Sequence, residues 1–182
     1  RSAVAAVRIA TRCERAYWVL RRVFGVIPRF RLLVLDRADW DAHAEVPTYG
    51  IAHVTQAGHL VVGSEPAEAW HDVSAFLAAG LPAPVLRTLI SVHGRDTVHP
   101  DAPDLTGVAD SLIAHELAHL VANQAGVEFP KRWLLETFAN YALVAVLGET
   151  DPSGLHRLGT LAEAAQHLDH ALPTLEAFES PE

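Results

Sequence analysis

The segment IAHELAHLV, residues 113–121, combines the pattern HExxH with the apolar periodicity of a helix. Residues four positions apart in an α-helix are separated by about 400° of rotation, so His115 and His119 project from one face, one turn apart. Two imidazoles at this spacing can bind one zinc ion. Glu116 lies about 100° around the helix from His115, beside the ion and not on it. We therefore predict a zinc site at which the Glu116 carboxylate acts as general base toward water.

A catalytic zinc site needs three protein ligands and one open position, so a third ligand must come from another segment. WLLETFANY, residues 133–141, contains Glu136 in an apolar helical context. A carboxylate in such surroundings is costly to bury unless it is paired or bound to a metal. His115, His119 and Glu136 are therefore the predicted Zn²⁺ ligands. Asn140, one turn after Glu136, is a candidate to accept a hydrogen bond from a ligand imidazole and fix its tautomer; a capping or surface amide is the alternative.

HELAH followed by WLLETFANY resembles the gluzincin metallopeptidases, the thermolysin-like and zinc aminopeptidase-like enzymes. The resemblance is most specific over residues 107–147 and weaker over residues 17–63. It implies that the two histidines and Glu136 hold Zn²⁺, and that Glu116 activates water to hydrolyse a peptide bond. The GxMEN-like strand with which the aminopeptidases grip a free amino terminus is absent from this chain. The resemblance therefore implies peptidase activity without aminopeptidase specificity.

The fold expected from these patterns is α+β and zincin-like, with a small twisted sheet packed on the active-site helix and on the helix of the glutamate ligand. The expected elements, in chain order, are a helix ending near Gly25, strands at 31–35, 49–54 and 60–62, helices at 66–79, 84–93, 107–123 and 130–148, and a helix at 161–171. The second and third strands should form a hairpin, and the third is a candidate for the sheet edge on which an extended peptide pairs. We expect residues 1–182 to form a single domain; a proteolytic domain without its C-terminal portion is an alternative.

The net charge of −8 is distributed unevenly along the 182 residues. Residues 1–37 contain nine basic and two acidic side chains, so they carry +7 and the other 145 residues carry −15. Such an acidic body does not attract polyanions, and nucleic acid is not an expected partner. The basic segment is interpreted as a helix that packs on the core beside the acidic body. A membrane-surface or targeting helix is the alternative interpretation.

The cellular setting is indicated by two further features. No apolar run approaches the roughly 18 residues that cross a bilayer, so no membrane span is expected. Cys13 is the single cysteine, which excludes an internal disulfide and favours a reducing compartment such as the cytoplasm. The expected partner is a peptide or protein substrate.

Peptide hydrolysis also needs a group that stabilises the oxyanion. The gluzincins place a Tyr or His for this role well downstream of the glutamate ligand, and only 46 residues follow Glu136 here. The candidates are His156, His167, His170 and Tyr141, the last of which is turned about 140° away from the direction of Glu136. The short downstream stretch supports a rival interpretation, a zincin-like metal-binding scaffold or pseudoenzyme without peptidase activity. A zinc metallopeptidase is the favoured one.

Overall fold

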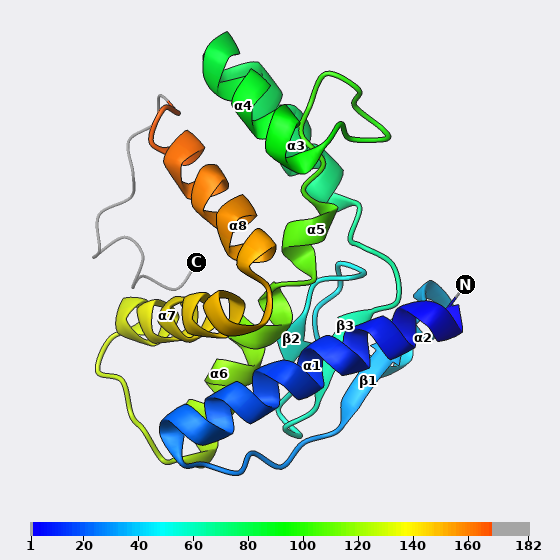
Figure 1. Cartoon of the computed structure of the whole chain (residues 1–182). Coiled ribbons are helices and arrows are strands. Elements are labelled where there is room, and N and C mark those ends of the chain that lie inside the picture. Colours follow the sequence, from blue (N-terminus) through cyan, green and yellow to red (C-terminus); the bar gives the residue numbers. More distant parts are fainter. Residues whose placement is uncertain (1, 169–182) are drawn as a thin grey trace.

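The computed structural model describes residues 2–168 and shows an α+β fold, in which helices surround one small mixed sheet (Figure 1). The α+β class expected from the sequence is thereby confirmed. The helices and strands are α1 (Ser2–Phe24), β1 (Leu32–Leu35), α2 (Arg37–His43), β2 (His53–Val54), β3 (Leu60–Gly63), α3 (Ala69–Gly80), α4 (Ala83–His93), α5 (Thr106–Ala109), α6 (Leu112–Gln124), α7 (Arg132–Thr150) and α8 (Pro152–Ala165).

β3 is the central strand of the three-stranded sheet, whose order is β1-β3-β2. It pairs parallel with β1, with Leu32 opposite Leu60, and antiparallel with β2, with His53 opposite Val61. The predicted hairpin is confirmed, and Gly58 in its turn has a φ of 74°, which favours glycine. The strand considered as a peptide-binding edge is therefore not an edge, because it is hydrogen-bonded on both sides. The edges are β1 and β2.

The largest apolar core lies between α1, α6 and α7. Ala16 and Leu20 of α1, Leu117 and Val121 of α6, and Leu143 of α7 are all at most 2% exposed. On α1, Ala16 and Leu20 are four residues apart, and so are Leu117 and Val121 on α6. Each of these helices therefore turns one apolar stripe inward. This core fixes α6 against α7, the two helices that carry the predicted metal ligands.

The sheet packs on α1 and α6 through a second apolar cluster. Ile9 and Cys13 of α1 and Ile113 of α6 contact Leu60 and Val62 of β3. Burial raises the pKa of the Cys13 thiol to about 11, so this side chain is a neutral packing residue. The prediction had placed the sheet on both ligand helices. Instead, the sheet lies mainly on α6, while α7 packs mainly on α6, α1 and α8.

The basic helix α1 lies beside acidic groups of neighbouring helices. Arg8 and Arg12 pair with Asp110 between α5 and α6, and Arg22 pairs with Glu149 near the end of α7. The pairs are consistent with the interpretation of a core-packed helix next to an acidic body. Among residues 2–168, no helix combines the length and the apolar character needed to span a membrane.

The helix expected over 107–123 is divided into α5 and α6, so that prediction was wrong in one detail. The division lies at Asp110 and Ser111, where the Ser111 N–H donates to the Val108 carbonyl at 2.9 Å. This bond spans three residues and not four, which tightens the turn. The tight turn directs the Asp110 carboxylate toward α1, and the helix that carries HExxH begins only at Leu112.

The expected ends of the last two helices also differ from the structure. α7 runs past Gly148, because the residue that leaves helical geometry is Asp151, with a φ of −150°. The Asp151 side chain accepts a hydrogen bond from the Gly154 N–H and so caps α8. α8 consequently starts at Pro152, earlier than the start predicted at residue 161. The predicted end of this helix, at residue 171, lies outside the described residues. Asp followed by Pro is a helix-start signal that the apolar periodicity alone does not include.

The segment between β1 and β2 contains α2, a helix that was not predicted. β2 itself is shorter than the predicted strand. Asp36 caps the short α2 by accepting hydrogen bonds from two backbone N–H groups of its first turn. Trp40 of α2 is 1% exposed and donates its indole N–H to the Val46 carbonyl. The strand expected over 49–54 forms only at its end, as β2. Burial of Trp40 and its hydrogen bond are long-range effects that the local pattern does not report.

Candidate metal centre

The three predicted ligand side chains meet between α6 and α7. His115 Nε2 lies 2.9 Å from His119 Nε2 and 3.2 Å from Glu136 Oε2, and that oxygen lies 3.5 Å from His119 Nε2. Atoms bound to a tetrahedral zinc ion at ~2.0–2.1 Å are separated by about 3.3 Å. The three ligand atoms thus form a triangle of the size that a zinc ion requires. Two imidazoles and one carboxylate are also a donor set that zinc binds in catalytic sites.

The packing of α6 determines which way the histidines point. Leu117, Ala118 and Leu120 are buried in the core, so the opposite stripe of the helix faces α7 and the solvent. The His115 and His119 side chains are 12% and 19% exposed, while the rest of each ring is enclosed by protein. A partly open site of this kind leaves room for water or substrate on one side of the triangle.

Both imidazoles are held in the form that binds a metal. The Nδ1 of His115 lies 3.0 Å from Asn140 Oδ1, an acceptor, so Nδ1 carries the proton and the Nε2 lone pair points at the other two ligands. Burial lowers the pKa of His119, and the neighbouring His115 lowers it further. A low pKa favours the neutral imidazole, which is the ligand form. The proposed role of Asn140 thus has a direct geometric basis.

Replacement of this orienting amide is expected to weaken zinc binding without unfolding the protein. In Asn140→Ala the His115 ring loses its only described partner on Nδ1, and zinc affinity should fall about 10-fold, near the lower end of such effects. Competition with a chromophoric chelator measures this affinity. Asn123→Ala, which removes an exposed amide from the end of α6, is the matched control and should leave zinc affinity unchanged. Equal affinities in the two variants would show that Asn140 does not orient the ligand.

Glu116 lies next to the triad but is not part of it. Burial, together with the negative charge of Glu136, raises the pKa of its carboxyl group to about 7, although a hydrogen bond from the Val54 backbone N–H opposes the rise. A cation bound to the triad would favour the ionised carboxylate. The hydrogen bond from β2 also fixes the direction of the carboxylate. Val54 was missed by sequence reasoning, since a backbone donor leaves no signal in a motif.

A groove of about 880 Å³ opens onto Glu116 and His119. One wall is formed by β2 and its flanking residues, which include Val54. The other wall is formed by the end of α6, the connection to α7 and the first turn of α7, with Phe129 and Arg132. The groove is large enough for several residues of an extended peptide. Its walls come from segments that are distant in sequence, so no local pattern indicated it.

The sequence-based candidates for the oxyanion group do not line this groove, as far as the structure describes them. Tyr141 is 69% exposed. His156 is an exposed residue of α8, and His167 lines a separate small cavity between α4 and α8. His170 lies outside the described residues. The structure therefore does not place Tyr141, His156 or His167 at the groove, because Tyr141 lies on the exposed side of α7 and the two histidines lie on or directly after α8.

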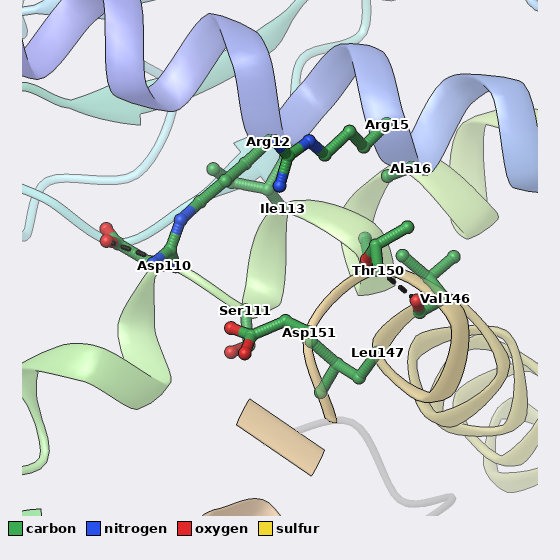
Figure 2. A pocket seen from close by; sticks show the side chains of 11 residues that line it. Arg12, Arg15, Ala16, Asp110, Ser111, Ile113, Val146, Leu147, Thr150 and Asp151 are labelled. Atoms are coloured by element: carbon green, nitrogen blue, oxygen red, sulfur yellow. Dashed lines mark hydrogen bonds and ion pairs between the residues drawn. The ribbon is translucent and has the colours of Figure 1, made fainter. Parts of the chain in front are cut away.

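A second cavity, of about 180 Å³, lies between α1, the start of α6 and the α7–α8 junction (Figure 2). Arg12 and Arg15 of α1 border it on one side, and Asp110 and Asp151 border it on the other. Both carboxylates are already paired, Asp110 with Arg12 at 3.3 Å and Asp151 with Arg157 at 3.6 Å. None of the triad residues lines this cavity. It is therefore separate from the metal centre, and its Arg12–Asp110 ion pair connects α1 to the start of α6.

No protein-family model, curated protein or solved structure matches the chain. The resemblance to the gluzincins therefore remains a prediction from the sequence motif.

Proposed function

We propose that this protein is a zinc-dependent peptidase of the gluzincin type, with a zincin-like fold. The observation that carries the proposal is the convergence of His115, His119 and Glu136, whose ligand atoms lie within 3.5 Å of one another. Two further features support it. Glu116 lies beside the triad without joining it, and the groove leads directly to both.

The residues of the site divide the chemistry of hydrolysis between them. When bound by the triad, zinc supplies a Lewis acid that polarises the scissile carbonyl and lowers the pKa of water to about 7. Glu116 accepts a proton from the attacking water while the water oxygen forms a bond to the carbonyl carbon. The C–N bond then breaks, and Glu116 returns the proton to the leaving amine. No bond forms between substrate and protein at any step.

The surrounding residues hold this arrangement in place. Asn140 fixes the ring of His115, and the Val54 N–H fixes the carboxylate of Glu116. Leu117 and Ala118, both fully buried, exclude water from behind the ligand helix. Such supporting contacts reduce the reorganisation that the reaction requires.

A metal-binding scaffold without catalytic activity is the second candidate function. The specific observation in its favour is that none of Tyr141, His156 and His167 lines the groove, so the oxyanion group of the family has no counterpart at these positions. A scaffold would keep zinc for stability and cleave no peptide. The two candidates therefore differ in activity and not in metal content.

Digestion of a mixed peptide library, read by mass spectrometry, tests the proposal. Zinc-loaded protein should generate new peptide termini, protein stripped by a chelator should generate none, and added zinc should restore the cleavage. The chelator-treated sample is the control for contaminating serine and cysteine proteases. Absence of cleavage by the fully zinc-loaded protein would favour the scaffold, and cleavage that persists after zinc removal would rule out a metallopeptidase.

A further inference from the structure

His53, the first residue of β2, is a buried histidine whose two ring nitrogens both bind backbone atoms. The residue is 8% exposed. Its Nδ1 lies 2.9 Å from the Ile51 carbonyl, an acceptor, so Nδ1 carries the proton. Nε2 is then an acceptor, and the Glu45 N–H donates to it at 3.1 Å. A neutral imidazole in one tautomer therefore connects β2 to the loop that follows α2.

That loop is held against β2 at a second point. The Glu45 carboxylate accepts a hydrogen bond from the Gln56 N–H at 2.9 Å, just after the end of the strand. Trp40 of α2 packs edge-on against the His53 ring, with 5.7 Å between the ring centroids. β2 is only two residues long and is paired with a strand on one side only. The loop therefore supports β2 from outside the sheet, and His53 is the side chain through which it does so.

The position of β2 determines where the Val54 N–H lies. In the hairpin the Thr55 N–H donates to the His59 carbonyl at 2.9 Å. Backbone N–H groups alternate in direction along a strand, so the Val54 N–H points away from the partner strand. It meets the Glu116 carboxylate there, while the Val54 side chain packs on the core that contains α6. A shift of β2 would move this donor away from Glu116.

We propose that His53 is a positioning residue for the general base: it holds β2 in the place from which the Val54 N–H fixes the Glu116 carboxylate. This inference rests on the proposed peptidase function. Because both nitrogens of His53 are engaged by the backbone, the ring has no polar atom left for a substrate. Its contribution to the reaction passes through Glu116. A carboxylate with a fixed direction requires less reorganisation when it accepts a proton from water.

The alternative role of His53 is purely structural, as a packing partner of Trp40. The two roles predict different measurements. A structural role would lower the free energy of unfolding but leave kcat of the folded, zinc-loaded protein unchanged. A positioning role would lower kcat at full zinc occupancy, because the three predicted ligands lie on α6 and α7 and not on β2.

His53→Phe keeps a ring against Trp40 and removes both hydrogen bonds. With zinc-loaded chain and a peptide that the wild type cleaves, kcat should fall about 10–10²-fold, while KM and zinc affinity stay nearly unchanged. His43→Phe makes the same substitution at an exposed residue of α2 that does not border the groove, and it should retain normal kcat. In the Glu116→Gln background, His53→Phe should cause no further loss, because its effect acts through Glu116.

Two amide variants test the same role with a polar side chain. The side-chain oxygen of His53→Gln reaches the place of Nε2 and can accept the Glu45 N–H, whereas the shorter His53→Asn cannot. We expect His53→Gln to retain more of the wild-type kcat than His53→Asn. This comparison decides between the two roles if His53→Phe does not fold.

Amide hydrogen exchange, read by NMR, follows the Val54 N–H without any activity measurement. In His53→Phe this amide should exchange at least about 10-fold faster than in the wild type. The Thr55 amide, which is bonded within the hairpin, should be unaffected and serves as the internal reference. An equal rise at both amides would indicate unfolding of the hairpin, which is the structural role.

The outcomes separate this inference from the proposed function. If the wild type shows no zinc-dependent cleavage, the proposed function is rejected, and the role of His53 in it is rejected as well. If the wild type is active and His53→Phe has the kcat of His43→Phe, only the role of His53 is rejected. An equal loss from His53→Phe in the wild-type and Glu116→Gln backgrounds would show that His53 does not act through Glu116 and would also overturn the inference.

Discussion

Glu116→Gln is expected to bind zinc as tightly as the wild type and to cleave peptides at least about 10³-fold more slowly. The amide keeps the size of the side chain and its proximity to the Val54 N–H, but it cannot accept a proton from water. Because Glu116 is not a ligand in the triad, the metal should stay in place. Peptide cleavage rates and metal analysis on the same preparation measure both quantities.

Glu14→Gln is the matched control for this variant. Glu14 is an exposed carboxylate of α1 that does not border the groove, so the substitution makes the same chemical change away from the site. It should retain normal activity. Glu116→Gln with wild-type activity would remove the general base from the mechanism, and loss of zinc from that variant would place Glu116 among the ligands.

Glu136→Ala is expected to lose zinc affinity by more than about 100-fold, which exceeds the effect of losing an orienting partner. The substitution removes the only ligand that α7 contributes to the described triad, and the two histidines of α6 alone do not complete a zinc site. Activity should disappear at zinc concentrations that saturate the wild type. Zinc titration and thermal unfolding with and without zinc measure the loss, because an ion that binds only the folded state raises the unfolding temperature.

Glu149→Ala provides the comparison on the same helix. Glu149 is a carboxylate near the end of α7 that pairs with Arg22 at the surface, and its loss should change the stability little, because solvent screens such a pair. Zinc should raise the unfolding temperature of this variant as much as that of the wild type. An equal zinc-dependent shift in Glu136→Ala would mean that the carboxylate of α7 does not bind the ion.

The parts of the site that could be predicted from sequence are those set by local geometry. The relation of His115 to His119 follows from helical periodicity alone, and the place of Glu116 beside them follows from the same periodicity. Glu136 was predictable because an isolated carboxylate in an apolar helix requires a partner. Asn140 was predictable for the same reason as His119, since it lies one turn from a ligand.

The remaining features depend on contacts between distant segments, which a single sequence does not report. The hydrogen bond from Val54 to Glu116 requires β2 to lie over α6, and the groove requires that same strand to face the start of α7. The division between α5 and α6 was missed because the turn at Asp110 is accompanied by ion pairs with Arg8 and Arg12 of α1, which are distant in sequence. The candidates on α8 failed because no local pattern indicates the direction in which that helix turns.

Zinc K-edge X-ray absorption of the reconstituted wild-type protein reports directly on the ligands of the proposed metal centre. We expect one zinc ion per chain with nitrogen and oxygen ligands at ~2.0–2.1 Å, and outer-shell scattering from two imidazole rings. That imidazole scattering should decrease in His119→Ala. A protein that retains no zinc after reconstitution, or a bound zinc without imidazole scattering, would contradict the metal centre and the hydrolysis built on it.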